Sequence, residues 1–437
     1  MNLSGIFNKI SPKKALVIGD FMLDTYTLGQ AGRISPEAPV AVVKVESVQQ
    51  RPGGAGNVVL NLRSLGMEVA AVGRLGSDDS GEKLLDSLKE EGVLVDGCVV
   101  QSCYKTPVKN RIIAANQQMV RIDYEEDALL PEQMEQQVIE ALPKLLDDVS
   151  VVAISDYGKG FLTDTLLAEL IGLARRLGIP VIADPKGIDF SKYAESTLIK
   201  PNFSEAVAVS GLDARADLDL IAKNVLSSSK CDRLIITRSE KGLSLFDKEG
   251  NRQDFPVAIR KVKDVTGAGD TVLAVITFIL ANGLPLSDAC RMANIAAGLA
   301  VEELGCARIT LQALAKRLLE EDVENKVFDD QHIYALKEVL NGRDVVLLGI
   351  DEGTEVSADL LKSIRSCKQG GRDLILYLRD KDPCPELIHI LTTLKEVDYL
   401  IHHGESFRKL CRMIHPSLVY IFGKGKLQTI EEPALLM

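Results

Sequence analysis

The segment 264–272, which reads D-V-T-G-A-G-D-T-V, carries residue types that could do chemistry. Its glycines, Gly267 and Gly269, would let an anion approach the backbone closely where a turn enters a helix. A helix N-terminus offers unpaired N–H groups and a partial positive charge, and Asp270 falls in the first turn, where the dipole favours an ionised carboxylate. Amides that neutralise a moving charge, beside a carboxylate that accepts a proton, are what phosphoryl transfer to a hydroxyl requires.

The distribution of histidine favours a carboxylate as the base. All five histidines stand at or beyond His332, so the first three-quarters of the chain has no histidine base and no histidine metal ligand. Two other glycine-rich patterns are incomplete. Residues 76–83 have P-loop spacing but Glu82 where lysine must stand, and residues 54–57 lack the third glycine of a dinucleotide fingerprint. A P-loop and a nicotinamide site are therefore both disfavoured.

Composition favours small-molecule partners. The 437 residues suggest two or more domains, and a hydrophobic content of 46% is ample for a large core. The formal net charge of −11, without a basic run, argues against nucleic acid or an anionic membrane as a partner. No apolar stretch is long enough for a membrane span, and the first residues lack the order of a signal peptide, so we expect a cytoplasmic protein. The eight cysteines form no C-x-x-C pair, which indicates reduced thiols.

Short apolar runs alternate with helical stretches over the first two-thirds of the chain. We expect strands at 14–20, 151–155, 180–184, 197–199 and 233–237, separated by helices such as 164–177 and 205–210. This alternation predicts an α/β fold, a doubly wound and mostly parallel sheet with both faces covered. Ligands bind such sheets at the carboxyl ends of the strands, which are followed here by Asp20, Asp156, Asp184, Asn202 and Arg238. Each of these alone is more simply explained as a helix cap or loop residue, but together they favour a site.

Two regions depart from this rhythm and predict a small β lid over the site. Residues 39–48 are rich in β-branched side chains, and residues 106–114 and 118–124 alternate as the two arms of a hairpin across Asn116 and Gln117. We place the lid at about 35–60 and 105–125.

A second, smaller α/β domain follows a charged stretch at 320–326. We expect strands at 345–350, 373–378, 399–402 and 418–422 and helices at 358–367, 387–395 and 407–414. The predicted domains are therefore 1–320 and 335–437.

The D-x-T-G-A-G-D string resembles the signature of PfkB-type, ribokinase-like sugar kinases, and the resemblance continues to about residue 315. Within that family the chain looks most like the heptose-7-phosphate kinase branch, which forms the kinase half of the bifunctional heptose kinase/adenylyltransferase of lipopolysaccharide synthesis. The matching strings are G-D-F-M-L-D at 19–24, R-I-S-P-E-A-P-V at 33–40, R-P-G-G-A-G-N-V at 51–58, N-Q-Q at 116–118 with Arg121, S-D-Y-G-K-G at 155–160, D-P-K-G at 184–187, P-N-F-S-E at 201–205 and T-R-S-E at 237–240.

The resemblance implies roles for the matched residues. Asp270 would be the catalytic base, and the amides of Gly267, Ala268 and Gly269 would form the anion hole. Sugar contacts are expected from Asp20, Gly53, Gly54, Asn57 and Asp184, and contacts to a substrate phosphate from Arg121 and Lys186. ATP is expected at Asn202, Ser204, Glu205, Arg238 and Asn294, with Mg²⁺ held by Asn202 and Glu205 partly through water. Asp264 and Thr266 resemble a monovalent-cation loop for K⁺, which Gly305 would close.

For three of these residues a structural role stays open. Arg121 and Lys186 are equally explained as members of surface ion pairs, and Asn294 as a packing residue.

The implied reaction is transfer of the ATP γ-phosphoryl group to a sugar hydroxyl. In the heptose branch the acceptor is the anomeric hydroxyl of D-glycero-D-manno-heptose 7-phosphate, and the product is the 1,7-bisphosphate. A homodimer formed through the lid is expected, because the lids of this family often pair two subunits.

The smaller domain resembles the nucleotidyltransferase half of the same bifunctional enzyme, in residues 360–376, 394–401 and 414–419. Active transferases have a His-x-Gly-His motif after the first strand, but residues 349–357 read G-I-D-E-G-T-E-V-S, without histidine and with three acids that would repel a triphosphate. We expect no adenylyl transfer here, a role in assembly, stability or regulation, and a separate adenylyltransferase as a partner. His402 and His403 do not predict a metal site, because neighbours on a strand point to opposite faces.

Two alternatives stay open. The chain could be a PfkB kinase for another sugar or sugar phosphate, or a non-catalytic regulator that binds a sugar or a nucleotide. The intact G-A-G-D and N-x-x-E strings argue against the regulator.

Overall fold

The computed structural model describes residues 3–115, 117–257, 262–303, 305–322, 326–329, 332–380, 382–402 and 406–430. The chain divides into a larger unit, Ser11–Thr310, and a smaller unit that joins Met1–Ile10 to Leu311–Met437. This division differs from the predicted domains, because the N-terminal segment η1 (Leu3–Lys9) packs with α9 (Leu311–Asp322) and α10 (Ile333–Leu340) in the smaller unit. Within the predicted boundary segment, residues 323–325 lie outside the described residues.

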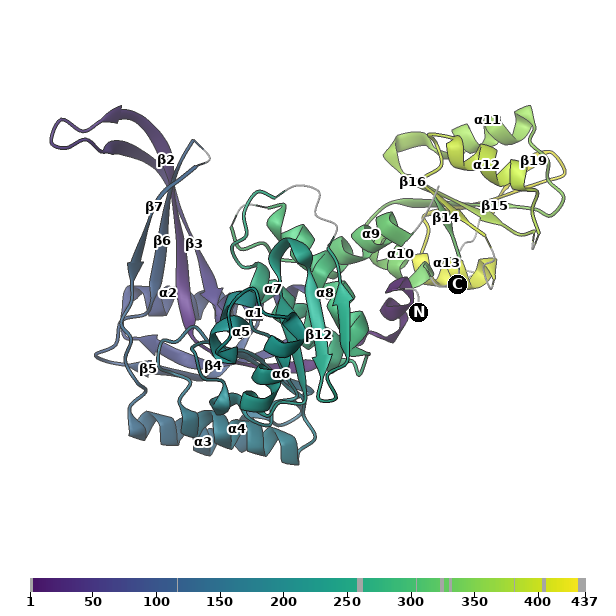
Figure 1. Cartoon of the computed structure of the whole chain (residues 1–437). Coiled ribbons are helices and arrows are strands. Elements are labelled where there is room, and N and C mark those ends of the chain that lie inside the picture. Colours follow the sequence, from purple (N-terminus) through teal and green to yellow (C-terminus); the bar gives the residue numbers. More distant parts are fainter. Residues whose placement is uncertain are drawn as a thin grey trace. The chain divides into compact units, whose positions relative to one another are not determined.

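The larger unit is built on a nine-stranded sheet (Figure 1). Its order across the sheet is β13 (Arg252–Phe255), β12 (Leu243–Asp247), β11 (Arg233–Thr237), β10 (Leu198–Ile199), β9 (Val181–Asp184), β8 (Val151–Ser155), β1 (Lys14–Gly19), β4 (Glu68–Gly76) and β5 (Leu94–Gln101). All neighbours are parallel except at β12 and β13, which pair antiparallel at one edge. The predicted strands are therefore present, within one residue at each end.

Helices cover both faces of this sheet, as predicted. Leu16 and Ile18 of β1 join a core with α3 (Glu132–Leu145), α4 (Asp164–Arg176) and α6 (Leu218–Ser229). Successive residues of a strand point to opposite faces, so Ala15 and Val17 face the other layer. That layer contains α1 (Ala55–Ser64), α7 (Ala268–Ala281) and α8 (Leu286–Val301), with α7 packed against the other two. The remaining helices of the unit are α2 (Asp79–Glu90) and α5 (Phe203–Ser210).

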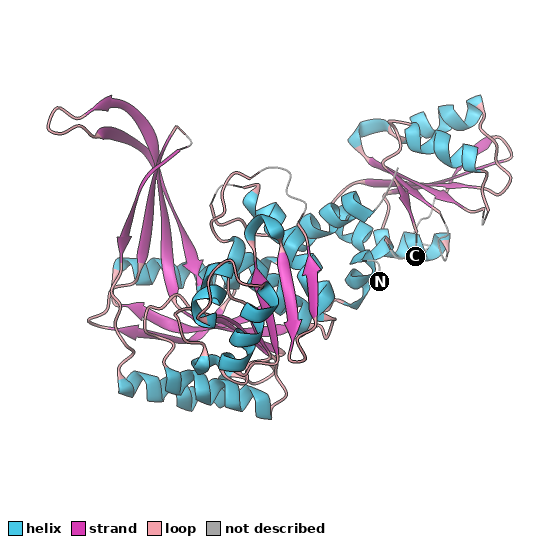
Figure 2. Cartoon of the chain, in the orientation of Figure 1, coloured by secondary structure: helices cyan, strands magenta, loops and turns pink. Residues whose placement is uncertain are grey.

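A separate four-stranded sheet forms the lid, which Figure 2 shows rising from the main sheet of the larger unit. Its order is β3 (Ala41–Gly54), β2 (Phe21–Ile34), β6 (Val108–Ala114) and β7 (Gln117–Tyr124). The hairpin of β6 and β7 is confirmed, although Asn116 of its turn lies outside the described residues.

The predicted extent of the lid was wrong in two places. Strand β2, which pairs with both β3 and β6, was not predicted, and residues 55–60 were predicted in the lid although α1 begins at Ala55. The second half of β2, from Leu28, contains two glycines and is exposed from Gln30 onward, so its sequence lacks the apolar alternation that indicates a strand.

The smaller unit contains a six-stranded sheet. Its order is β14 (Val327–Phe328), β17 (Tyr399–Ile401), β16 (Asp373–Leu378), β15 (Val345–Ile350), β18 (Leu418–Gly423) and β19 (Lys426–Thr429), and only β19 is antiparallel. Its helices include α11 (Ala358–Cys367), α12 (Pro385–Thr393) and α13 (Phe407–Ile414). The predicted second α/β pattern is confirmed. In the described parts of both units, no helix has the length and apolar character needed to cross a bilayer.

Candidate active site

The start of α7 has the geometry of an anion cradle. Gly267 is the N-cap, with φ 76° and ψ 0°, and an added Cβ would lie 2.6 Å from Asn57 Nδ2 and 3.1 Å from Cys306 Sγ. Backbone conformation and space therefore both require glycine at this position. An added Cβ at Gly269 would meet nothing within 4 Å, so that side of the helix start is open.

The free donors of this cradle differ from the predicted set. The N–H groups of Gly267, Gly269 and Asp270 donate to no group in the described part of the chain, whereas the N–H of Ala268 donates to the carbonyl oxygen of Val265 at 3.3 Å. Unsatisfied N–H groups at a helix N-terminus are suited to hold a phosphate.

Asp270 is buried, with 4% of its surface exposed, and its two carboxylate oxygens have different partners. Asn57 Nδ2 donates to Oδ2 at 2.9 Å, and the Tyr157 hydroxyl donates to Oδ1 at 2.6 Å. Asn57 is itself held by Asn61, whose Nδ2 donates to its Oδ1 at 3.2 Å. These hydrogen bonds fix the orientation of the carboxylate. The sequence did not predict a role for Tyr157.

Burial raises the pKa of Asp270 to about 6, although the hydrogen bonds from Asn57 and Tyr157 lower it. The sequence had suggested that the helix dipole would favour the ionised form, but desolvation outweighs that effect. A carboxylate with a pKa near 6 is a better proton acceptor at neutral pH than an ordinary aspartate and is still largely ionised.

An ion pair between Lys200 and Asp184 influences the pKa of this carboxylate. Lys200 is 2% exposed, and its Nζ lies 2.9 Å from Asp184 Oδ2. Burial raises the pKa of Asp184 and Lys200 lowers it, while Asp184 raises and Lys200 lowers the pKa of Asp270. The residue that was expected to bind sugar is therefore already paired, and Lys200 was not predicted.

The carboxylate of Asp20 binds backbone N–H groups of the site. Its Oδ2 accepts the N–H groups of Tyr157 at 2.9 Å and Lys159 at 3.0 Å, and burial and the nearby Asp156 raise its pKa. Asp20 thus holds the loop after β8, which carries Tyr157. Its second carboxylate oxygen has no hydrogen bond within the described residues.

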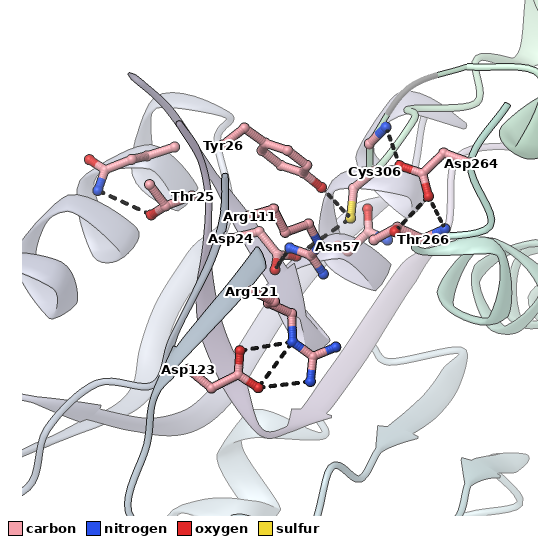
Figure 3. Close-up of polar contacts among 12 residues, drawn as sticks. Asp24, Thr25, Tyr26, Asn57, Arg111, Arg121, Asp123, Asp264, Thr266 and Cys306 are labelled. Atoms are coloured by element: carbon pink, nitrogen blue, oxygen red, sulfur yellow. Dashed lines mark hydrogen bonds and ion pairs between the residues drawn. The ribbon is translucent and has the colours of Figure 1, made fainter. Parts of the chain in front are cut away.

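Asp24 is a buried carboxylate in the string G-D-F-M-L-D at 19–24, and the sequence did not predict a role for it. It forms an ion pair of 2.5 Å with Arg111, and Cys306 Sγ lies 3.5 Å from its Oδ2 (Figure 3). A Cβ at Gly53 would collide with this carboxylate. Asp24 follows Asp20 by four residues on an extended chain, and this spacing could have indicated a second carboxylate on the same side.

The glycines expected to face the sugar are also explained by their own surroundings. Gly54 caps α1 with φ 57°, and a Cβ there would lie 2.6 Å from the carbonyl oxygen of Asp20. Gly53 and Gly54 are therefore required for the close packing of β2, β3 and the loop after β1.

A cavity of about 400 Å³ adjoins the helix start. Its lining includes Ala268 and Gly269 at one side, and Val257, Val265, Val272 and Asn294. Asn294 Nδ2 donates to the carbonyl oxygens of Phe255 at 2.7 Å and Pro256 at 3.4 Å. These carbonyls can only accept, so the amide nitrogen must face them and Oδ1 stays available as an acceptor. The cavity has the apolar lining and few polar groups that suit a purine base.

A second hollow, of about 570 Å³, is lined by Asn202, Ser204 and Arg238. Arg238 Nη2 lies 3.2 Å from Asp254 Oδ1, while its Nε is buried and has no hydrogen-bond partner among the residues that the structure describes. A buried guanidinium nitrogen with no partner fits an anionic ligand at this position.

Asn202 and Glu205, the expected magnesium residues, form a capping box at the start of α5. Asn202 Oδ1 accepts the N–H of Glu205 at 2.9 Å, and Glu205 Oε2 accepts the N–H of Asn202 at 3.0 Å. Lys186 Nζ lies 2.7 Å from Glu205 Oε1, so the expected phosphate ligand Lys186 is also engaged. Within the described residues no group of three His, Cys, Asp or Glu could hold a metal. The donor set fits a Mg²⁺ ion held mainly by nucleotide phosphates and water.

The expected monovalent-cation loop is closed around Asp264. Its Oδ1 accepts the N–H and the hydroxyl of Thr266, and its Oδ2 accepts the N–H of Gly305 at 2.9 Å (Figure 3). Burial raises the pKa of Asp264, but these hydrogen bonds outweigh it and the pKa is lowered. The ionised carboxylate thus organises the loop that precedes Gly267.

Arg121 lies on β7 and pairs with Asp123 of the same strand. Its Nε lies 2.9 Å from Asp123 Oδ1, and both residues are shown in Figure 3. The surface ion pair that the sequence left open is therefore what the structure contains.

In the smaller unit, an ion pair lies at the carboxyl ends of two neighbouring strands. Asp351, directly after β15, forms an ion pair of 2.5 Å with Arg379, directly after β16. A Cβ at Gly423 of β18 would collide with the Asp351 carboxylate, and one at Gly349 would lie 3.0 Å from the Phe407 ring. His403 lies outside the described residues.

Comparison with known proteins assigns the larger unit to a family. A family model described as "pfkB family carbohydrate kinase" matches residues 12–313. Bifunctional protein HldE of Trichlorobacter lovleyi is 40% identical over 422 residues, which cover 91% of this chain and 85% of that protein. Bifunctional protein HldE of Geobacter sulfurreducens is 38% identical over 437 residues, which cover 92% and 86%.

Two solved structures show the same fold. Phosphofructokinase-2 from Escherichia coli, in complex with potassium, superposes with a TM-score of 0.59 at 23% identity and covers 71% of this chain and 99% of that one. Arabidopsis thaliana ribokinase, complexed with ribose and ATP, gives a TM-score of 0.55 at 18% identity, with 70% and 99% covered. The predicted ribokinase-like α/β fold is confirmed.

Proposed function

Because this chain belongs to the pfkB family of carbohydrate kinases, we propose that its larger unit transfers the γ-phosphoryl group of ATP to a hydroxyl of a sugar phosphate. One observation carries the proposal: the buried carboxylate of Asp270 lies at the helix start where the backbone N–H groups of Gly269 and Asp270 have no acceptor among the described residues. A base and an anion cradle at one helix start are the two parts that phosphoryl transfer needs.

In this mechanism Asp270 accepts the proton of the attacking hydroxyl while Asn57 and Tyr157 hold its orientation. The amides of Gly269 and Asp270 neutralise charge on the transferring group, and Arg238, from the adjoining hollow, binds nucleotide phosphate oxygens. Asn202 and Glu205 would hold Mg²⁺ through water, and the ion would supply charge neutralisation on the phosphates. K⁺ at the loop of Asp264 and Thr266 belongs to the same proposal.

The substrate we propose is D-glycero-D-manno-heptose 7-phosphate, phosphorylated at the anomeric hydroxyl to the 1,7-bisphosphate in ADP-heptose synthesis for the lipopolysaccharide core. Support comes from the identity of 37–40% to bifunctional HldE proteins over most of the chain, together with the R-I-S-P-E-A-P and N-Q-Q strings that resemble the heptose branch.

For the smaller unit we propose no adenylyl transfer, although its relatives are named bifunctional. The ion pair of Asp351 and Arg379 lies at the carboxyl ends of β15 and β16, where ligands of parallel sheets bind. The acidic segment 351–355 repels a triphosphate, and a separate adenylyltransferase would act on the product.

We also propose a homodimer formed through the lid. Val120, Ile122 and Tyr124 alternate along β7, with 48%, 36% and 58% of their surfaces exposed, and Val48 of β3 is 57% exposed. Covering such side chains with a second lid would bury apolar surface that a lone subunit leaves in water.

The test is an acceptor panel with the full-length chain, in which ADP release is coupled to a spectrophotometric signal. The panel contains ribose, fructose 6-phosphate, D-glycero-D-manno-heptose and its 7-phosphate. We expect the highest kcat/KM with heptose 7-phosphate and a 1,7-bisphosphate product by ³¹P NMR. A higher kcat/KM with another acceptor would overturn the substrate, and no ADP release with any acceptor would overturn the kinase.

A further inference from the structure

One face of the lid sheet, which we call the inner lid face, carries several cationic side chains. Directly paired residues share a face of a sheet, so register places Arg51, Asp24, Lys109 and Asp123 in one row and Tyr26, Arg111 and Arg121 in the next row of that face. Asp24 and Tyr26 both contact Cys306, whose Sγ would lie 3.1 Å from a Cβ on Gly267. This inner lid face therefore borders the start of α7.

Most charges on the inner lid face are already matched. Arg111 is paired with Asp24, and Arg121 with Asp123, as Figure 3 shows. Arg51 donates from Nη1 to the carbonyl oxygen of Cys306 at 3.4 Å. These groups can bind a further anion only by giving up or sharing a partner that they have.

Lys109 differs from the other cations of this face. Its Nζ lies 5.2 Å from the centroid of the Tyr157 ring, and no carboxylate within the described residues forms an ion pair with it. The same Tyr157 donates its hydroxyl to Asp270 at 2.6 Å, so one aromatic ring contacts both the ammonium and the base. Lys109 is half-buried, and the ring face compensates only part of the cost of removing its charge from water.

We propose that Lys109 binds the anionic substituent of the acceptor and makes the enzyme selective for a phosphorylated sugar over its neutral counterpart. The inference rests on the proposed function and names the residue that sets the substrate class. A phosphate beside Tyr157 meets the unpaired ammonium, while the hydroxyl to be phosphorylated reaches Asp270 at the far edge of the same ring. A neutral sugar leaves the ammonium without a counter-charge.

The assignment replaces the two cations that the sequence suggested. Lys186 is 2.7 Å from Glu205, and Arg121 is paired with Asp123, so either must lose a carboxylate partner before it can bind a phosphate fully. Lys109 needs no such exchange, and this difference decides between the three.

The test compares heptose 7-phosphate with unphosphorylated D-glycero-D-manno-heptose in the full-length chain. Lys109→Gln should lower kcat/KM for the phosphorylated acceptor by about 10- to 100-fold, mainly through KM, and change it less than about threefold for the neutral sugar. Lys109→Arg should restore most of the loss, because it keeps the charge. Lys44→Gln, at an exposed lysine of β3, is the matched control and should behave as the wild type.

Two results would overturn the inference. One is an equal loss on both acceptors after Lys109→Gln, which indicates a structural role. The other is a phosphate-selective loss after Arg121→Gln but not after Lys109→Gln. Calorimetric binding of heptose 7-phosphate without turnover separates this inference from the proposed function. If the wild type turns over no acceptor, the kinase proposal is refuted. In that case weaker binding of heptose 7-phosphate by Lys109→Gln than by the wild type would still support the role of Lys109. Equal binding by both proteins, or no binding by the wild type, would refute that role.

Discussion

The hydroxyl of Tyr157 donates a hydrogen bond of 2.6 Å to Oδ1 of Asp270, from a loop that lies 113 residues away in the chain. Because the loop of Tyr157 is itself held by the Asp20 carboxylate, two buried acids act in series: one positions the tyrosine, and the tyrosine positions the other acid. The pKa of Asp270 therefore depends on the hydrogen bond from Tyr157, which a substitution of Tyr157 can remove without changing the charge of the site.

Tyr157→Phe should move the acid limb of the kcat/KM profile to higher pH by about one unit. The hydrogen bond from Tyr157 lowers the pKa of Asp270, so its loss raises that pKa further above about 6 and leaves less of the ionised base at pH 6 to 7. The measurement is kcat/KM from pH 5 to 9, with Tyr420→Phe in the smaller unit as the control. An unchanged profile would mean that the contact does not tune the base.

Asp270→Asn should lower kcat by about three orders of magnitude or more while nucleotide binding, measured by calorimetry, stays within a few-fold. The amide cannot accept the proton, but it keeps the size of the side chain and leaves the cavity for the nucleotide unaltered. Turnover near that of the wild type would remove Asp270 from the role of base.

The same variant should stabilise the protein at neutral and higher pH. The pKa of Asp270 is raised from 3.8 to about 6 in the folded chain, so the folded state binds the proton more tightly, and stability from this group is lost as pH rises from about 4 through 6. Above that window the buried charge costs on the order of 3 kcal/mol, which Asp270→Asn removes. Thermal unfolding should show the difference between variant and wild type growing from pH 4.5 to 7 and then levelling off. A difference that does not vary with pH would contradict the linkage.

The two glycines of the cradle should respond differently to alanine. Gly267→Ala introduces a Cβ at φ 76° and 2.6 Å from Asn57, so we expect a loss of about 1–3 kcal/mol in unfolding free energy together with a loss of activity. Residue 269 is helical, and an added Cβ there meets no protein atom, so Gly269→Ala should leave the unfolding free energy nearly unchanged. We expect kcat/KM to fall, because the methyl group occupies the open side of the phosphate cradle. Denaturant unfolding and kinetics on both variants test the pair, and full activity in Gly269→Ala would exclude close phosphate approach there.

The buried pair of Asp24 and Arg111 should be costly to break from one side. Arg111→Gln leaves the Asp24 carboxylate buried without its partner, and we expect a loss of about 3–5 kcal/mol in unfolding free energy. Adding Asp24→Asn should recover part of the loss, since the uncompensated charge is then gone. A denaturant-based double-mutant cycle measures the coupling, and strictly additive effects would show that the two residues stabilise the lid independently.

The chain should show no adenylyl transfer. With the kinase silenced by Asp270→Asn, heptose 1-phosphate and ATP should release no pyrophosphate above the background without enzyme. The experiment uses the full-length chain, because residues 1–10 belong to the same compact unit as residues 311–437, with Ile6 and Phe7 buried. Enzyme-dependent pyrophosphate release would show that the smaller unit is active despite its missing motif.

Local patterns were sufficient for the alternating strands and helices of the main sheet, for its parallel order and for a candidate base. Buried strands such as β8 and β15 are unbroken apolar runs, and the G-A-G-D string marks a helix start by its composition alone, so neither needs information from distant residues. What the sequence by itself determined is therefore the fold class and Asp270 as the candidate base.

The tertiary structure alone decided which polar groups are free to act. The sequence left open whether Arg121, Lys186 and Asp184 bind substrate or have structural partners, and in the structure each has a partner, respectively Asp123, Glu205 and Lys200. Tyr157, Asp24 and Lys109 emerged because folding brings strand ends and lid rows from far apart in the chain to one helix N-terminus. Whether a charge is paired, and whether burial raises a pKa, depends on neighbours in space, and spacing along the chain does not encode those neighbours.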